Sequence, residues 1–152
     1  MKENTIILGV IGSDCHAVGN KILERVFMEA GFHVVNLGIM VSQQEFIDAA
    51  IETNAQAILI SSLYGQGELD CEGMRQRCIE MGLEDILLYV GGNLVIGKTD
   101  HRIIEAKFKS MGYDRVFGPD DDLQEAVQLL KNDIIKGHAL KAGQHGLQTK
   151  AS

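Results

Sequence analysis

The pattern of hydrophobic and polar positions divides the chain into five short apolar runs separated by longer amphipathic segments. The apolar runs predict β-strands over residues 5–11, 33–37, 57–61, 86–90 and 115–117. The intervening segments have apolar residues at helical spacing, which predicts helices over residues 19–30, 68–81, 100–111 and 120–136. A further helix is expected to begin near Ser42, because Ser42 and Glu45 form a capping-box pattern. Strands and helices therefore alternate along the chain.

The predicted strands are apolar throughout rather than alternately polar, which indicates that helices cover both faces of the sheet. Single helices between strands predict parallel, right-handed crossovers. This pattern is typical of a flavodoxin-like, doubly wound α/β fold with five parallel strands in the order 2-1-3-4-5. In that order the loops after residues 11 and 60 lie side by side at the switch point, where ligands bind in such sheets.

The domain organisation follows from where this periodicity ends. Residues 1–136 are expected to form one domain, which is long enough to bury a hydrophobic core. Residues 137–152 are rich in Gly, Lys and Gln and have little periodicity, so we expect a flexible C-terminal tail. A role of this tail in binding a partner is the second interpretation.

Composition narrows the classes of partner. Hydrophobic residues make up 45% and charged residues 23% of the chain, as in soluble globular proteins. The net charge of −7 argues against nucleic acid as a partner, because phosphate binding needs a basic surface. No apolar run approaches the roughly 18 residues of a membrane helix, and the N-terminus does not resemble a signal peptide. We therefore expect a cytoplasmic protein without a membrane partner.

The three cysteines do not predict a disulfide framework or a zinc site. Cys71 and Cys78 are placed on one predicted helix, about 10 Å apart, which is beyond disulfide reach. They are expected to be buried or incidental thiols. Cys15 differs only because Asp14 and His16 flank it.

Four loops are expected at the carboxyl edge of the sheet, and they are rich in small residues. They contain Ser13-Asp14-Cys15-His16-Ala17-Val18-Gly19, Ser61-Ser62-Leu63-Tyr64-Gly65-Gln66-Gly67, Gly91-Gly92-Asn93-Leu94-Val95-Ile96-Gly97-Lys98 and Phe117-Gly118-Pro119. Each loop alone is consistent with a tight turn. Together, small residues that allow close approach to the backbone, combined with apolar side chains, favour a large and partly apolar ligand.

Phosphate-binding alternatives fit less well. Residues 92–99 match the Walker pattern, but they follow the fourth strand, and no convincing Walker B carboxylate follows a neighbouring strand. A phosphorelay receiver needs an Asp after the third strand, where this chain has Ser61 and Ser62. A dinucleotide-binding glycine motif is absent after the first strand. Nucleotide binding is therefore disfavoured.

Asp14 and His16 point instead to a transition-metal cofactor. Imidazole is a good ligand for such metals, and its second ring nitrogen needs an acceptor that fixes the tautomer. Asp14 is close enough in sequence to supply that carboxylate. One His cannot hold a bare ion, so the remaining ligands are expected to belong to a macrocycle.

These motifs resemble the cobalamin-binding signature shared by adenosylcobalamin-dependent mutases and cobalamin-dependent methionine synthase. The resemblance rests on Asp14-x-His16-x-x-Gly19, Ser61-x-Leu63 and Gly91-Gly92, and it covers residues 3–136. It implies a Rossmann-like cobalamin-binding domain in which His16 replaces the cofactor's own base as axial ligand to cobalt, in the base-off, His-on state. Asp14 would hydrogen-bond His16.

The resemblance also implies the path of the cofactor's nucleotide tail. Gly19 would open a channel between the sheet and the first helix, Ser61 and Leu63 would contact the tail or corrin, and Gly91-Gly92 would let the tail pass the backbone. The other expected cofactor-binding residues are Ser13, Cys15, Ala17, Ser62, Tyr64, Asn93, Leu94, Val95, Ile96, Gly97, Phe117 and Gly118. No catalytic side chain is expected in this chain.

Within this group, the loop sequences are very similar to those of the small, or sigma, subunits of glutamate mutase. That similarity implies an isomerase component that binds adenosylcobalamin and acts with a larger catalytic subunit, whose barrel holds the substrate. The expected assembly is two small plus two large chains. The reaction would be the radical carbon-skeleton isomerisation of L-glutamate to L-threo-3-methylaspartate, in glutamate fermentation.

Two other cobalamin proteins remain as alternatives. One is the small subunit of another cobalamin mutase, such as one acting on acyl-CoA thioesters. The other is a corrinoid methyl-carrier protein. Methyl carriers usually place a helical cap before this domain, whereas only four residues precede the first predicted strand here. A binding domain unrelated to cobalamin is the remaining interpretation.

Overall fold

The computed structural model describes residues 4–13, 17–62, 67–92, 101–118 and 121–151. Its strands are β1 (Thr5–Val10), β2 (His33–Asn36), β3 (Ala57–Ser61), β4 (Leu87–Gly91) and β5 (Arg115–Phe117). Its helices are α1 (Val18–Glu29), α2 (Gln43–Thr53), α3 (Gly67–Cys71), α4 (Met74–Glu80), α5 (His101–Ser110) and α6 (Leu123–Ala151). Most boundaries lie within one to three residues of the predicted ones, as is usual for element ends.

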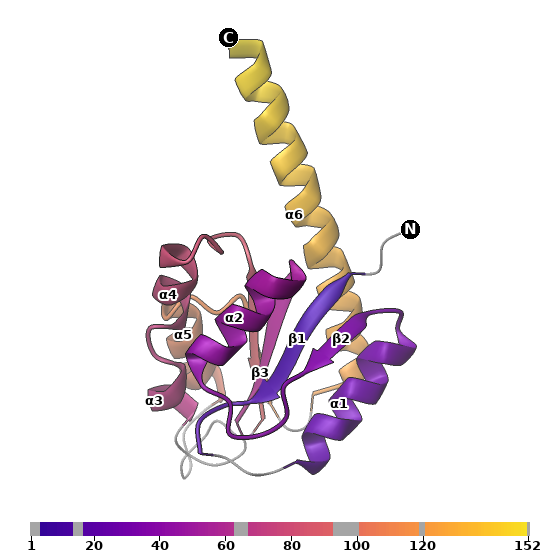
Figure 1. Cartoon of the computed structure of the whole chain (residues 1–152), viewed down its shortest axis with the longest axis vertical. Helices are drawn as coiled ribbons and strands as arrows, with labels where there is room; N and C mark the ends of the chain where they lie inside the picture. Colours follow the sequence, from indigo (N-terminus) through magenta and orange to yellow (C-terminus); the bar gives the residue numbers. More distant parts are fainter. Residues whose placement is uncertain (1–3, 14–16, 63–66, 93–100, 119–120, 152) are drawn as a thin grey trace.

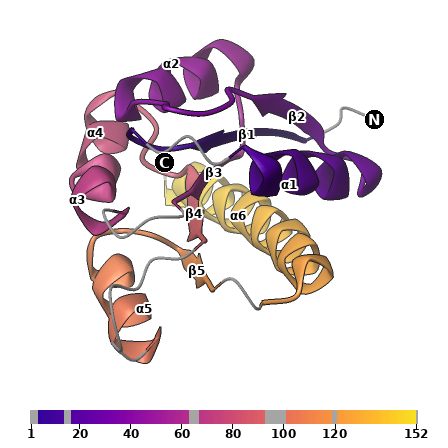
Figure 2. The same ribbon diagram turned by 90° about the horizontal axis from the view of Figure 1, so that it is seen from below.

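The five strands form one sheet in the order β2-β1-β3-β4-β5, and every neighbouring pair is parallel. The predicted doubly wound topology is therefore confirmed. Helices α1 and α6 lie on one side of the sheet, and α2, α3, α4 and α5 lie on the other (Figures 1 and 2). The carboxyl ends of β1 and β3 are adjacent, with Val10 in register with Ser61.

Burial on both faces explains why the strands lack alternation. In β1, Ile6 and Leu8 pack against α1 and α6, whereas Ile7 packs against the helices of the other side. All three side chains are fully buried. A strand covered on both faces buries every side chain, so its sequence is continuously apolar.

Helix α2 begins as the sequence predicts. The backbone N–H of Glu45 donates to Ser42 Oγ over 3.1 Å, and the Ser42 N–H donates to Glu45 Oε1 over 3.2 Å. This capping box satisfies two donors that the helix cannot pair internally. The capping-box prediction is therefore confirmed.

The single helix predicted over residues 68–81 is wrong, because the chain forms two short helices there. Gly73 separates α3 from α4 and adopts a left-handed backbone with φ of 81°. Cys71 and Cys78 consequently lie on different helices, and both are buried and free. Burial raises the pKa of the Cys71 thiol to about 12. The expectation of buried thiols is confirmed. The distance along a single helix, which argued against a disulfide, does not apply, because the two residues lie on different helices.

The last helix also differs from its predicted range. Helix α6 starts at Leu123 rather than near residue 120 and continues to Ala151 instead of ending near residue 136. Its C-terminal half extends away from the sheet (Figure 1). Ala, Lys, Leu and Gln in this stretch favour a helix and its glycines oppose one, so the helix continues there despite the lack of an apolar periodicity. The boundary between domain and flexible tail stays a prediction.

Among the described residues, no helix combines the length and apolar character needed to cross a membrane.

Candidate functional site

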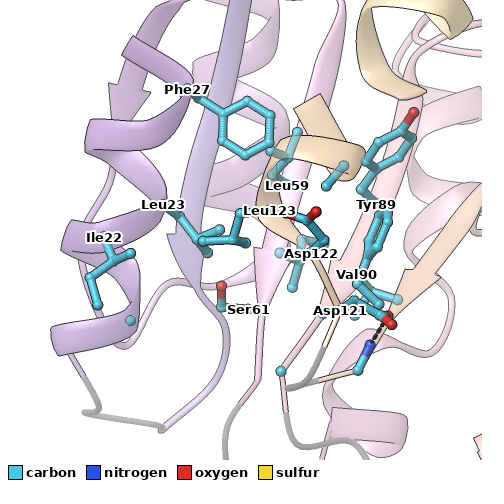
Figure 3. A pocket seen from close by; sticks show the side chains of 17 residues that line it. Ile22, Leu23, Phe27, Leu59, Ser61, Tyr89, Val90, Asp121, Asp122 and Leu123 are labelled. Carbon is cyan, nitrogen blue, oxygen red and sulfur yellow. Dashed lines mark hydrogen bonds between the residues drawn. The ribbon is translucent and has the colours of Figure 1, made fainter. Parts of the chain in front are cut away.

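A cavity of about 340 Å³ lies between α1, the sheet and the first turns of α6 (Figure 3). Residues from α1, from β3, β4 and β5, and from the segment leading into α6 surround it. The lining comprises Gly19, Ile22, Leu23, Phe27, Leu59, Ile60, Ser61, Tyr89, Val90, Gly91, Gly92, Phe117, Gly118, Asp121, Asp122, Leu123 and Ala126. The cavity is therefore built on one sheet face, next to the carboxyl edge.

Helix α1 supplies the first wall of the cavity. Leu23 and Phe27 lie on one side of the helix because they are four residues apart, and Ile22, which precedes Leu23, also lines the cavity. The Phe27 ring packs edge-on against Phe32, with 5.8 Å between the ring centroids. Ile22 is half exposed, at 51%, although it is a large apolar residue. An apolar side chain left partly exposed beside a cavity favours an apolar ligand group at that position.

The sheet forms the floor of the cavity. Register places Val10, Ser61, Gly91 and Phe117 in one row across β1, β3, β4 and β5. The two central members of this row, Ser61 and Gly91, are small and both line the cavity. Larger side chains there would fill the space between the sheet and the helices. The cavity therefore depends on two small residues that are far apart in sequence.

Gly91 also has a close neighbour on the next strand. A Cβ at Gly91 would lie 3.4 Å from the Phe117 Cβ and 3.5 Å from the Phe117 carbonyl oxygen. These are ordinary van der Waals distances, so a small side chain would fit beside Phe117 while occupying cavity space. Gly92 adopts a φ of 108°, which favours glycine.

The opposite wall comes from β4, β5 and α6. The rings of Tyr89 and Phe117 pack with 5.6 Å between their centroids and both line the cavity. After β5, the Gly118 N–H donates to Asp121 Oδ2 over 2.6 Å (Figure 3). This hydrogen bond ties the segment after β5 to the segment before α6.

A charged network lies behind that wall. The Tyr89 hydroxyl donates a short hydrogen bond to Asp133 Oδ2 on α6. Arg115 binds the same carboxylate twice, with Nε at 2.7 Å from Oδ2 and the terminal nitrogen at 3.0 Å from Oδ1. Burial and the hydrogen bond to Asp133 raise the pKa of Tyr89, so its phenol stays protonated. Burial alone would raise the pKa of Asp133, but the hydrogen bonds from Arg115 and Tyr89 lower it below its ordinary value.

The start of the loop after β1 is fixed by its neighbours. The Val10 N–H donates to the Gly38 carbonyl over 2.8 Å, and the Gly12 N–H donates to the Val41 carbonyl over 2.9 Å. Gly12 has a φ of 72°, and a Cβ there would lie 2.4 Å from Asp70 Oδ2. Only glycine fits both the backbone conformation and the approach of Asp70.

The structure brings together six of the site residues expected from the sequence. Gly19, Ser61, Gly91, Gly92, Phe117 and Gly118 all line the cavity. The cavity lies between the sheet and the first helix, and its use as the channel for the nucleotide tail stays a prediction.

Three further described residues do not line the cavity. Ser62 is buried at 1% exposure, and its N–H donates to the Gly91 carbonyl over 3.0 Å. Ser13 and Ala17 are exposed on either side of residues 14–16. A direct cofactor contact of these three residues stays a prediction.

The remaining expected site residues lie outside the described residues. They are Asp14, Cys15, His16, Leu63, Tyr64, Asn93, Leu94, Val95, Ile96 and Gly97. The axial role of His16 and the supporting role of Asp14 therefore stay predictions. In the described part of the chain, no group of three or more His, Cys, Asp or Glu side chains could hold a metal ion.

Sequence reasoning missed much of the cavity wall. Tyr89, the apolar residues of α1, and Asp121, Asp122, Leu123 and Ala126 were not expected as site residues. Helical spacing shows that Leu23 and Phe27 face inward. It does not show that α6 lies on the same sheet face, which only the crossover geometry decides.

Comparisons with known proteins define the class of protein to which this chain belongs. Residues 4–128 match the family described as the B12 binding domain, so the chain belongs to that family. A cobalamin-binding protein from Desulfitobacterium hafniense DCB-2 has a similar fold, with a TM-score of 0.71 and 22% identity. That similarity covers 87% of this chain and 59% of the other.

Closer relatives place the chain within this class. The glutamate mutase sigma subunit of Escherichia coli O157:H7 is 63% identical over 138 residues, covering 91% of this chain and 93% of that protein. The glutamate mutase sigma subunit of Yersinia enterocolitica is 60% identical, covering 97% of this chain and all of that protein. The chain belongs to the family of glutamate mutase sigma subunits, which are components of a cobalamin-dependent isomerase.

Proposed function

We propose that this subunit binds adenosylcobalamin and presents it to a larger catalytic chain. The two chains together would isomerise L-glutamate to L-threo-3-methylaspartate. The similarity to sigma subunits over nearly the whole length supports this reaction. When bound, the cofactor supplies the radical chemistry, and the protein supplies binding, orientation and exclusion of water. The observation that carries the proposal is the apolar cavity at the carboxyl edge of β3 and β4.

The cavity fits the nucleotide tail of the cofactor. Its volume of about 340 Å³ is near the lower end of small-molecule pockets, so it suits a nucleoside-sized group and not a whole corrinoid. The lining of Leu23, Phe27 and Leu59 suits a flat, apolar base such as dimethylbenzimidazole. Gly19, Ser61 and Gly91 leave room for the tail to pass the backbone. The corrin ring would then lie outside the cavity, over the loops.

With the tail held in this cavity, the cofactor's own base would lie away from cobalt, and a protein side chain would take its place. We assign that role to His16, with Asp14 hydrogen-bonded to the far nitrogen of its imidazole. The fixed backbone at Val10 and Gly12 supports this assignment, because it anchors the chain directly before residues 14–16. The other loop residues expected from the sequence would contact the corrin.

The test is electron paramagnetic resonance of the cob(II)alamin complex, prepared with nitrogen-15 histidine in the protein. A superhyperfine pattern that changes from nitrogen-14 to nitrogen-15 splitting would assign a protein His to cobalt. The same label in a His16→Gly variant should have no effect on the spectrum. A wild-type spectrum unaffected by the label would overturn the base-off, His-on assignment.

The proposed partner is a larger catalytic subunit with a substrate-holding barrel, in an assembly of two small plus two large chains. Sigma-subunit relatives support the existence of a catalytic partner. Mixing the protein with that subunit and adenosylcobalamin should yield methylaspartate from glutamate. Methyl transfer without isomerisation would favour the corrinoid methyl carrier, and turnover of an acyl-CoA thioester would favour another mutase. The cytoplasmic location stays a prediction.

A further inference from the structure

We propose that Tyr89, Asp133 and Arg115 form a clamp that positions the cavity wall and thereby sets the affinity for the nucleotide tail. These three residues are positioning residues, since only Tyr89 lines the cavity and none is assigned to the chemistry. The inference rests on the proposed function, because it assumes that the tail occupies this cavity.

The clamp joins three elements through one carboxylate. Asp133 on α6 accepts the hydroxyl of Tyr89 from β4 and two N–H groups of Arg115 from β5. The side chain of Asp133 is only 14% exposed, and that of Arg115 is 34% exposed. Such a partly desolvated, two-pronged Arg–carboxylate contact is stronger and more directional than a surface ion pair.

The elements that it joins are the ones that form the wall. Tyr89 and Phe117 line the cavity from β4 and β5, and Leu123 and Ala126 line it from α6. Strand β5 has three residues and pairs only with β4, so its ladder holds it weakly. Arg115 opens this strand and Phe117 ends it. Fixing Arg115 to α6 therefore fixes the distance between Phe117 and the helix.

The Tyr89 hydroxyl is the most informative group to remove. Tyr89→Phe keeps the ring, which is 2% exposed and packs against Phe117. It removes one of the hydrogen bonds that hold α6 against β4. Because the ring shape is unchanged, any effect on tail binding would come from the position of the wall and not from a lost apolar contact.

The chain offers a matched control on the opposite side of the sheet. Arg75 on α4 donates to Asp114 Oδ2 over 2.8 Å, and the same oxygen accepts the Leu88 N–H over 2.8 Å. This pair also ties a helix to the β4–β5 end of the sheet. Arg75 and Asp114 do not line the cavity. Arg75→Met should therefore lower the stability of the protein without changing its affinity for the nucleotide tail.

The experiment compares two ligands on the full-length protein. Dissociation constants are measured for cobalamin and for cobinamide, which has the corrin ring but no nucleotide tail. Tyr89→Phe should weaken cobalamin binding by about tenfold and leave cobinamide binding unchanged. Arg115→Lys keeps the charge but loses the two-pronged geometry, so it should behave in the same way. Arg75→Met should leave both dissociation constants unchanged.

A separate variant tests the site itself. Leu23→Trp would fill the cavity from α1 and should weaken cobalamin but not cobinamide binding. Unchanged cobalamin binding in this variant would overturn the tail site, and the clamp proposal with it. If Leu23→Trp shows the loss but Tyr89→Phe and Arg115→Lys do not, the clamp alone is overturned. Equal weakening of both ligands in the clamp variants would make the network merely structural and would also overturn the proposal.

Discussion

The two faces of the sheet are covered by helices but packed differently. On the face of α2, α3, α4 and α5, Ile58, Ile60, Leu88 and Val90 belong to one large, buried core. On the face of α1 and α6, the strands offer Leu59 and Tyr89 deeper in and the small Ser61 and Gly91 near the carboxyl edge. The first face is filled, and the second retains a cavity. One sheet thus combines a filled, stabilising face with the face on which we propose that the ligand binds.

The difference between the faces lies in single positions along each strand. In β3, Ile60 borders the cavity but belongs to the core of the filled face, while its small neighbour Ser61 lies on the cavity face. In β4, Val90 and Gly91 differ in the same way. Because side chains alternate between faces, a strand can be large on one face and small on the other within two residues.

The largest effect is expected from a deletion in the filled face. Phe46→Ala should lower the free energy of unfolding by about 3–5 kcal/mol, because Phe46 is fully buried and its removal leaves a void. Leu23→Ala on the cavity face should cost less, about 1–2 kcal/mol, since Leu23 borders an existing cavity. Urea denaturation of the cofactor-free protein measures both. Equal losses would contradict the contrast between the faces.

The next effect concerns the point where the filled face meets the loop after β1. Gly12→Ala should lower the free energy of unfolding by about 1–3 kcal/mol, because it places a Cβ against Asp70 of α3 in a left-handed backbone. The double variant with Asp70→Ala should recover part of this loss, since the contact is removed but the backbone strain remains. No recovery in the double variant would show that Asp70 does not restrict Gly12.

A smaller gain in stability is expected at Met40, in the connection between β2 and α2. Met40 is 59% exposed and has a φ of 54°, which is unfavourable for a long side chain. Met40→Gly should raise the free energy of unfolding by about 1 kcal/mol by relieving this conformation. Asn54, which ends α2 with the same φ, should gain less from glycine because Asn tolerates this region. Thermal denaturation compares the two, and an equal or larger gain at Asn54 would argue against strain at Met40.

The smallest effect on stability is expected at acidic pH, from Asp133 on the cavity face. Because the pKa of Asp133 is lower in the folded protein, its stabilising contribution is present above the unfolded-state pKa of about 4. This contribution is lost as the pH falls through the lower folded-state value. Asp133→Asn should therefore lose less stability than the wild type between pH 5 and pH 2. Parallel pH profiles of the urea midpoint would contradict this linkage.

Much of the architecture was predictable from local patterns. Continuous apolar runs gave the five strands, and the spacing of helices between them gave the parallel order, both of which the structure confirms. The capping pattern at Ser42 gave the start of α2. Gly73 and the helical continuation of α6 were not predicted, because an isolated glycine is compatible with a helix and the last residues lack periodicity.

The candidate site was likewise predictable only in part from the sequence. By itself, the sequence determined the motifs at residues 14–19, 61–63 and 91–92, and with them the resemblance to cobalamin-binding proteins. Only the tertiary structure decided that Ser61 and Gly91 lie side by side and that α1 and α6 enclose a cavity above them. It also decided that Tyr89, Arg115 and Asp133 meet. The physical reason is that each motif consists of residues that are neighbours in the sequence. A cavity or a clamp instead brings together distant segments, and this depends on strand register and helix packing.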